Sequence, residues 1–199
     1  MNAGDTAFIL LCAAFVFIMT PGLAFFYGGM VRRKNVGNTM MQCVFIMGLS
    51  VIMWVLVGYA LSFGGNHAGI IGGAKWFGFN GVEMKPGPYA DTIPNLAFAA
   101  FQMMFAMITP ALITGSVAGR MKFKALVLFI ILWSLIVYYP MAHMVWGEGG
   151  FLAEIGSVDF AGGNVVHITS GVSGLVLALT LGKRRGYDQG VYHVHNTPF

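Results

Sequence analysis

An aspartate and a histidine stand eight residues apart, Asp159 and His167, at the start of the otherwise uncharged segment 160–182. At the rise of an α-helix, His167 lies about 10 Å inside this segment. That depth is within a hydrocarbon core about 30 Å thick. An imidazole there can exchange hydrogen bonds with a small polar solute, or it can be a core histidine bonded between helices. The residue type alone favours neither interpretation.

Small residues surround His167 in the helical pattern. Gly163, Gly171 and Gly174 stand at i−4, i+4 and i+7 from it. In a regular α-helix these positions share one face, and glycine lets another helix approach closely. We therefore expect His167 to point toward neighbouring helices and away from lipid.

The composition predicts a membrane protein. Hydrophobic residues make up 57% of the sequence and charged residues 9%, whereas soluble domains carry about 25% charged residues. The net charge of +4 comes from short basic clusters between apolar runs. This pattern is a signal of membrane topology and not a nucleic-acid-binding stripe, so nucleic-acid binding is excluded.

Five uncharged runs are each long enough to cross a bilayer as a helix, which takes about 20 residues. They cover residues 7–31, 40–63, 94–119, 125–147 and 160–182. The predicted fold class is therefore all-α and polytopic, with a five-helix membrane domain at 1–182 and a cytoplasmic connection at 183–199.

The basic residues predict the orientation in the cell membrane. Nine of the eleven cations lie in the clusters 32–34, 120–124 and 183–185, which follow the first, third and fifth runs. By the positive-inside rule these ends are cytoplasmic. We expect the N-terminus outside and the C-terminus inside.

Four further residues of the apolar runs are candidate site residues by their type and position. Phe101 and Phe105 lie on one helical stripe, and large apolar side chains on helices mostly pack in a core. His143 and Trp146 lie at the outer end of the fourth run. They could line a vestibule, where an indole attracts a small cation by about 0.5 to 2 kcal/mol. Their position favours interfacial anchors instead, and Trp76 in the outer segment 64–93 is predicted to be another.

Enzyme chemistry lacks its usual motifs. The sequence contains no GxxxxGK[ST], HExxH, GxSxG or CxxC pattern, so we expect no enzyme, no resident metal and no cofactor. A haem protein would need axial ligands, for which only His143 and His167 are available within the apolar runs. That alternative predicts a visible absorption band.

Three separated stretches resemble the ammonium transporter (Amt/Mep/Rh) family, in the family's order. They are TPGLAFFYGGMVRRKNV at 20–36, AHMVW at 142–146 and DFAGGNVVH at 159–167. The resemblance implies an eleven-helix fold with two five-helix inverted repeats, a pore in each subunit and a homotrimer. The five predicted spans look like the first repeat, with an odd helix number that an inverted partner repeat requires.

The resemblance also implies roles for five residues. Trp146 and Phe101 are similar to the aromatic wall of an outer ammonium-recruitment site, and Phe105 to one of its gating phenyl rings. His167 is similar to the first of two lumen histidines, and Asp159 to the acid beneath the outer site. Without the resemblance, Asp159 is predicted to be a helix N-cap, and both roles are compatible.

The predicted function is therefore an ammonium transporter or channel, of which this chain is about half. Ammonium is captured outside, loses a proton and passes as ammonia through an apolar, histidine-lined pore in the lipid bilayer. The alternative is a membrane ammonium sensor or partner-binding protein. Methylammonium uptake, measured beside ligand-induced changes in a binding partner, separates the two.

Overall fold

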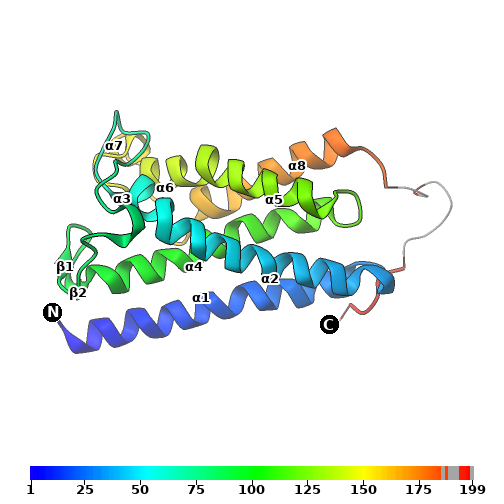
Figure 1. Cartoon of the computed structure of the whole chain (residues 1–199), viewed down its shortest axis with the longest axis horizontal. Coiled ribbons are helices and arrows are strands. Elements are labelled where there is room, and N and C mark those ends of the chain that lie inside the picture. Colours follow the sequence, from blue (N-terminus) through cyan, green and yellow to red (C-terminus); the bar gives the residue numbers. More distant parts are fainter. Residues whose placement is uncertain (185–186, 188–192, 198–199) are drawn as a thin grey trace.

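The chain folds into a bundle of long helices that run roughly side by side (Figure 1). The computed structural model describes residues 1–184, 187 and 193–197. This part of the chain contains five helices long and apolar enough to cross a membrane, Ala3–Met30, Arg33–Phe63, Asn95–Val117, Phe123–Glu154 and Gly163–Leu181. The predicted polytopic all-α fold is confirmed. The predicted connection 183–199 lies partly outside the described residues.

Three of the five spans change helix type along their length. The second span joins α2 (Val36–Met53) to α3 (Tyr59–Phe63) through a π-helical turn at Trp54–Gly58. The fourth joins α5 (Phe123–Trp133) to α6 (Tyr139–Trp146) through another, and the fifth begins with a third before α8 (Thr169–Leu181). A π-helical turn shifts the side chains that follow it around the helix axis, because each amide bonds five residues back.

Helix α4 (Asn95–Val117) lies at the centre of the bundle, packed against α1 (Ala3–Met30), α2 and α8. Hydrogen bonds from polar side chains fix the position of α4 against the second span, because such bonds are directional and apolar contacts are not. Trp54 Nε1 donates to the carbonyl oxygen of Ala99 at 3.0 Å, and the Tyr59 hydroxyl donates to Asn95 Oδ1 at 2.5 Å. Buried indole and phenol groups need such partners, so α4 is held in one register.

The segment 64–93 folds against the ends of the helices (Figure 1). It contains a short helical turn at Phe77–Phe79 and an antiparallel pair of strands, β1 (Pro86–Gly87) and β2 (Ala90–Pro94). Trp76 is buried here and stacks on Tyr59 with 5.1 Å between ring centroids. The prediction that Trp76 is an interfacial anchor is wrong, because the fold of this segment turns the indole into the core. A short α7 (Phe151–Glu154) follows α6 beside it.

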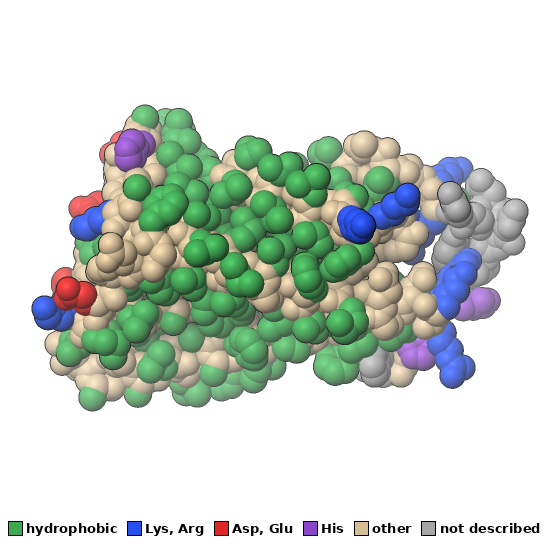
Figure 2. Space-filling model, in the orientation of Figure 1, with side chains coloured by type: hydrophobic (Ala, Val, Ile, Leu, Met, Phe, Trp, Pro, Cys, Tyr) green, Lys and Arg blue, Asp and Glu red, His purple; other side chains and the backbone are tan. Residues whose placement is uncertain are grey.

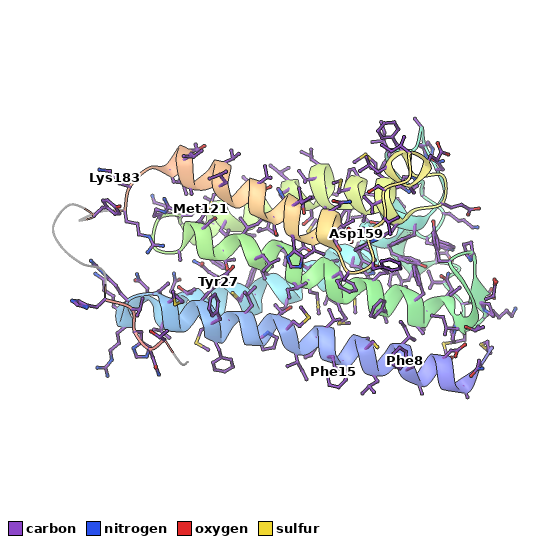
Figure 3. The ribbon with its side chains drawn as sticks, turned by 180° about the vertical axis from the view of Figure 1, so that it is seen from behind. Phe8, Phe15, Tyr27, Met121, Asp159 and Lys183 are labelled. Atoms are coloured by element: carbon purple, nitrogen blue, oxygen red, sulfur yellow. The ribbon has the colours of Figure 1, made fainter. Side chains whose placement is uncertain are left out.

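The two ends of the bundle differ in charge. On the face shown in Figure 2, the acidic side chains lie at the end that carries segment 64–93, and most of the basic side chains lie at the opposite end, with an apolar belt between them. The belt includes Phe8 and Phe15, which project from α1 away from the bundle (Figure 3). Such an apolar belt is suited to lipid or to further helices.

Glycine at position 58 is required by the contact between the second and fourth spans. A Cβ atom added to Gly58 would lie 2.7 Å from the Tyr139 ring and 2.9 Å from Trp54, whereas one added to Gly48 meets open space. We expect Gly58→Ala to lower the free energy of unfolding by about 1 to 3 kcal/mol, the usual cost of overpacking. Gly48→Ala in the same span should not lower it. Thermal unfolding of the purified chain in detergent measures both, and equal melting temperatures for the two variants would refute this packing.

Candidate functional site

An aromatic cluster joins side chains of α4 and of the end of α6. The rings of Phe101 and Phe105, one helical turn apart on α4, contact edge to face with centroids 5.2 Å apart. The Phe105 ring lies 6.0 Å from the Trp146 ring at the end of α6. All three side chains are partly exposed. The structure therefore brings three of the five predicted site residues together, and an indole face is a surface that attracts cations.

Asp159 connects this cluster to the fifth span. Its Oδ1 accepts the amides of Gly162 and Gly163, both at 2.7 Å, and its Oδ2 accepts those of Asn164 at 2.8 Å and Val165 at 3.1 Å. These amides lie at the start of the helix, so the carboxylate has the predicted capping role. It acts from three residues before the N-cap position, which Gly162 occupies. Partial burial acts to raise the pKa of Asp159, but the four amide donors outweigh it and hold the pKa below its usual range.

The backbone of Asp159 also holds the indole. Trp146 Nε1 donates to the carbonyl oxygen of Asp159 at 2.9 Å. The turn between the cap and the helix depends on Gly162, which has a φ of +85° and where a Cβ would lie 2.5 Å from Val166 Cγ2. One short segment thus sets both the start of the fifth span and the orientation of Trp146.

His167 lies in the π-helical turn Gly163–Ile168, which precedes α8. Its amide donates to the carbonyl oxygen of Gly162, five residues back, at 2.9 Å. Its side chain is exposed in the described chain. It lines a groove of about 460 Å³ between α1, α4 and α8, together with Tyr27, Leu112, Ser116, Ser170, Gly171, Gly174, Leu175 and Ala178. His167 is therefore not a core histidine sealed between the described helices.

The glycine pattern around His167 is only partly confirmed. Gly174 makes the predicted close approach, because a Cβ there would lie 3.3 Å from Ser116 Oγ on α4. Gly171 meets open space, and Gly163 lies beside the Asp159 carboxylate instead. The i−4 relation between Gly163 and His167 assumed a regular α-helix, which the π-helical turn replaces.

Tyr27 is a groove residue that the sequence reasoning missed. Its hydroxyl donates to the carbonyl oxygen of Leu112 on α4 at 2.8 Å, and a Cβ on Gly115 would lie 2.6 Å from its ring. Figure 3 places Tyr27 on the half of α1 nearer to Lys183, with Asp159 toward the opposite end. A tyrosine inside an apolar run needs a hydrogen-bond partner for its hydroxyl. The presence of Tyr27 in the first apolar run could therefore have indicated a contact with another helix.

His143 differs from both sequence interpretations. It is fully buried, with Nδ1 2.9 Å from the carbonyl oxygen of Ser62 and Nε2 3.3 Å from Asn66 Oδ1. It is neither an interfacial anchor nor part of the aromatic cluster, because α3 and the loop after it cover the ring. Both ring nitrogens have partners within the chain, which argues against His143 as a haem ligand.

Among the described residues, no three His, Cys, Asp or Glu side chains form a cluster that could hold a metal ion. His67, His193 and His195 are exposed there. Cys12 and Cys43 are free thiols.

These features define a polytopic α-helical membrane protein with an aromatic cluster and a groove that contains His167. The sequence matches the Ammonium Transporter Family model over residues 7–199, and the chain belongs to that family.

Relatives and solved structures agree with this assignment. The chain is 54% identical to the ammonium transporter of Bacillus subtilis over 93% of its own length and 45% of that protein, and 42% identical to ammonium transporter Amt1 of Archaeoglobus fulgidus over 100% and 48%. It superposes on the crystal structure of Saccharomyces cerevisiae Mep2 with a TM-score of 0.84 and 37% identity, covering 92% of this chain and 41% of that one. A structure described as a sensor Amt protein gives a TM-score of 0.86 at 26% identity, covering 98% and 49%.

The chain spans about half the length of the curated relatives that it matches. Those relatives are transporters, in agreement with the prediction that this chain is not an enzyme.

Proposed function

We propose that this chain forms half of an ammonium transporter, which captures ammonium at the aromatic cluster and conducts ammonia along the groove that contains His167. The observation that carries the proposal is that the Asp159 segment contacts both parts of the site. It bonds the Trp146 indole through its carbonyl and caps, through its carboxylate, the helix from which His167 reaches the groove. Capture and conduction elements are thus built on one short stretch of chain.

Capture depends on charge and aromatic surface. An indole face attracts a small cation by about 0.5 to 2 kcal/mol. The Asp159 carboxylate, kept ionised by its four amide donors, adds negative potential near Trp146. The partly exposed rings of Phe101 and Phe105 complete an apolar wall against which the ion loses part of its water.

Conduction requires the ion to lose its charge. An unpaired cation in an apolar path costs on the order of tens of kcal/mol in the idealised limit, whereas neutral ammonia avoids this charge penalty. Potassium has no proton to release, so the same path excludes it. Beyond the Phe105 ring, the imidazole of His167 supplies a hydrogen-bonding group to ammonia.

The chain spans about half the length of its relatives, so the proposed pore includes a second repeat. Corresponding helices from that repeat would cover the exposed apolar faces of α1 and α8 and close the groove into a pore. In this arrangement, 1–182 is the first membrane domain and 183–199 the cytoplasmic connection. The N-terminus lies outside, and three such subunits form a trimer.

A sensor is the second candidate, since a structure described as a sensor Amt protein shares this fold at 26% identity. Uptake of methylammonium distinguishes a transporter from a sensor. We define the extended protein as this chain followed by the part of the Bacillus subtilis relative that lies beyond the matched region. In cells without ammonium transporters of their own, the extended protein should accumulate labelled methylammonium. A sensor would bind methylammonium and alter a partner's binding without accumulation.

Trp146 gives the sharpest test of the capture step. We expect Trp146→Leu in the extended protein to raise the KM for methylammonium by about 3- to 30-fold, the ratio that corresponds to losing the cation–π attraction. Trp146→Phe keeps an aromatic face and should cost less. Uptake at a range of concentrations measures both, with Trp133→Phe as a control in the same span. An unchanged KM in Trp146→Leu would disprove capture at the indole.

A further inference from the structure

The buried ring of His143 faces two hydrogen-bond acceptors. The Ser62 carbonyl oxygen lies 2.9 Å from Nδ1, and a carbonyl can only accept, so Nδ1 carries a hydrogen. Asn66 Oδ1 lies 3.3 Å from Nε2. What Nε2 carries is then decided by the orientation of the Asn66 amide.

Two further bonds fix that orientation. Asn66 Nδ2 donates to the carbonyl oxygen of Gly149 at 3.0 Å, and Asn66 Oδ1 accepts the amide of Gly69 at 2.7 Å. Rotating the amide by 180° would break both bonds. The group opposite Nε2 is therefore an oxygen, and a neutral ring would set one lone pair against another. Only the doubly protonated imidazolium donates to both Ser62 and Asn66.

The His143 ring also lies against Gly147, the residue after Trp146. A Cβ on Gly147 would lie 2.4 Å from His143 Nδ1, and the Gly147 amide donates to the His143 carbonyl oxygen at 2.8 Å. The Asn66 amide bonds Gly149 two residues further on. The bonds of His143 and Asn66 therefore tie the end of α6, from which Trp146 projects, to α3 and the loop after it.

We propose that His143 is a proton-controlled positioning residue, whose protonated ring holds the end of α6 and so sets Trp146 for capture. The inference rests on the proposed function for its transport readout. Below the titration of the ring both bonds are present. As the pH rises through it, Nε2 loses its proton, the bond to Asn66 is lost and the end of α6 is held less firmly.

Other charges around His143 set the background for this titration. The titratable groups on the surrounding elements are Tyr59, His67, Lys75, Tyr89, Glu148 and Glu154. The two glutamates favour a charged ring, while Lys75 and a protonated His67 oppose it. Burial opposes the charge as well. His67 gives a matched control, because it is an exposed histidine in the neighbouring loop.

The transport test compares pH profiles in the extended protein between about pH 5 and 8, where histidine titrates. We expect the KM for methylammonium to rise by about 3- to 10-fold across the titration, the ratio expected from one hydrogen bond. His143→Gln, which cannot titrate, should remove this step, and His67→Gln should leave it in place. A step that survives in His143→Gln would overturn the proposal.

A second readout does not depend on transport. Nitrogen-15 NMR of the labelled imidazole in the extended protein, assigned with His143→Gln, should show both ring nitrogens protonated at the acidic end of the range and Nε2 deprotonated at the alkaline end. A ring with a bare Nε2 throughout would overturn the proposal. If the imidazole titrates as expected while no variant takes up methylammonium, the proposed function fails and the proton control of His143 stands.

Discussion

His167→Leu in the extended protein is expected to lower the rate of methylammonium uptake by about 10- to 100-fold. The reason is the cost of leaving a polar molecule without a partner in an apolar path, about 1 to 3 kcal/mol, since each 1.36 kcal/mol in a barrier is tenfold in rate. The groove beside His167 also contains Tyr27 and Ser170, but the Tyr27 hydroxyl already donates to Leu112 and the Ser170 hydroxyl to Val166. The imidazole is therefore the donor that these bonds leave available.

The control for this variant is the same change at an exposed histidine near the C-terminus, His193→Leu, which should leave uptake unaltered. His167→Gln keeps a hydrogen-bonding side chain and should retain part of the rate. Equal uptake by His167→Leu and the unmodified protein, with both folded in the membrane, would remove His167 from the conduction route.

The second large effect is expected at Asp159. Asp159→Ala removes the acceptor for four amides, and we expect it to lower the free energy of unfolding by about 2 to 4 kcal/mol, more than a typical cap, because the acceptor is charged. It should also abolish saturable uptake, because it removes the negative charge near Trp146 and the four amide bonds that fix the segment whose backbone carbonyl holds the indole. Asp159→Asn keeps one acceptor oxygen but turns an NH₂ toward two amides, so it should be intermediate.

The stability that the Asp159 carboxylate contributes should depend on pH. The folded state holds the pKa of Asp159 below its usual range, so the carboxylate stabilises the fold above its unfolded pKa of about 4. That contribution is lost as the pH falls through the lower, folded value. The difference in melting temperature between the unmodified protein and Asp159→Ala should therefore shrink in acid. Glu154→Ala, at an exposed acid nearby, is the control. A difference that is constant down to the most acidic pH tested would contradict the capping role.

The five spans could be predicted because a bilayer imposes a length and a composition that residue types reveal directly. Asp159 could be predicted as a cap for a similar reason, since an aspartate before a helix has one common local role. The pairing of Phe101, Phe105 and Trp146 needed the family resemblance. Their types alone favoured core packing and anchoring.

The remaining features depend on contacts between distant parts of the chain. The partner of the Tyr27 hydroxyl is a carbonyl 85 residues away, and His143 is buried by residues 77 and 81 positions before it. The π-helical turn at His167 leaves no pattern in the residue types, and it changes which glycines share its face. Hydrophobic periodicity assumes one helix type, so it could not predict these relations.

The most direct test of the conduction route is an experimental structure of the extended protein with methylammonium bound. We predict density for the ligand against the Trp146 ring and a continuous narrow passage from the Phe105 ring to the His167 imidazole, with the second repeat covering the groove. A His167 side chain that faces acyl chains, or one enclosed by side chains of the second repeat with no passage beside it, would contradict the proposed route.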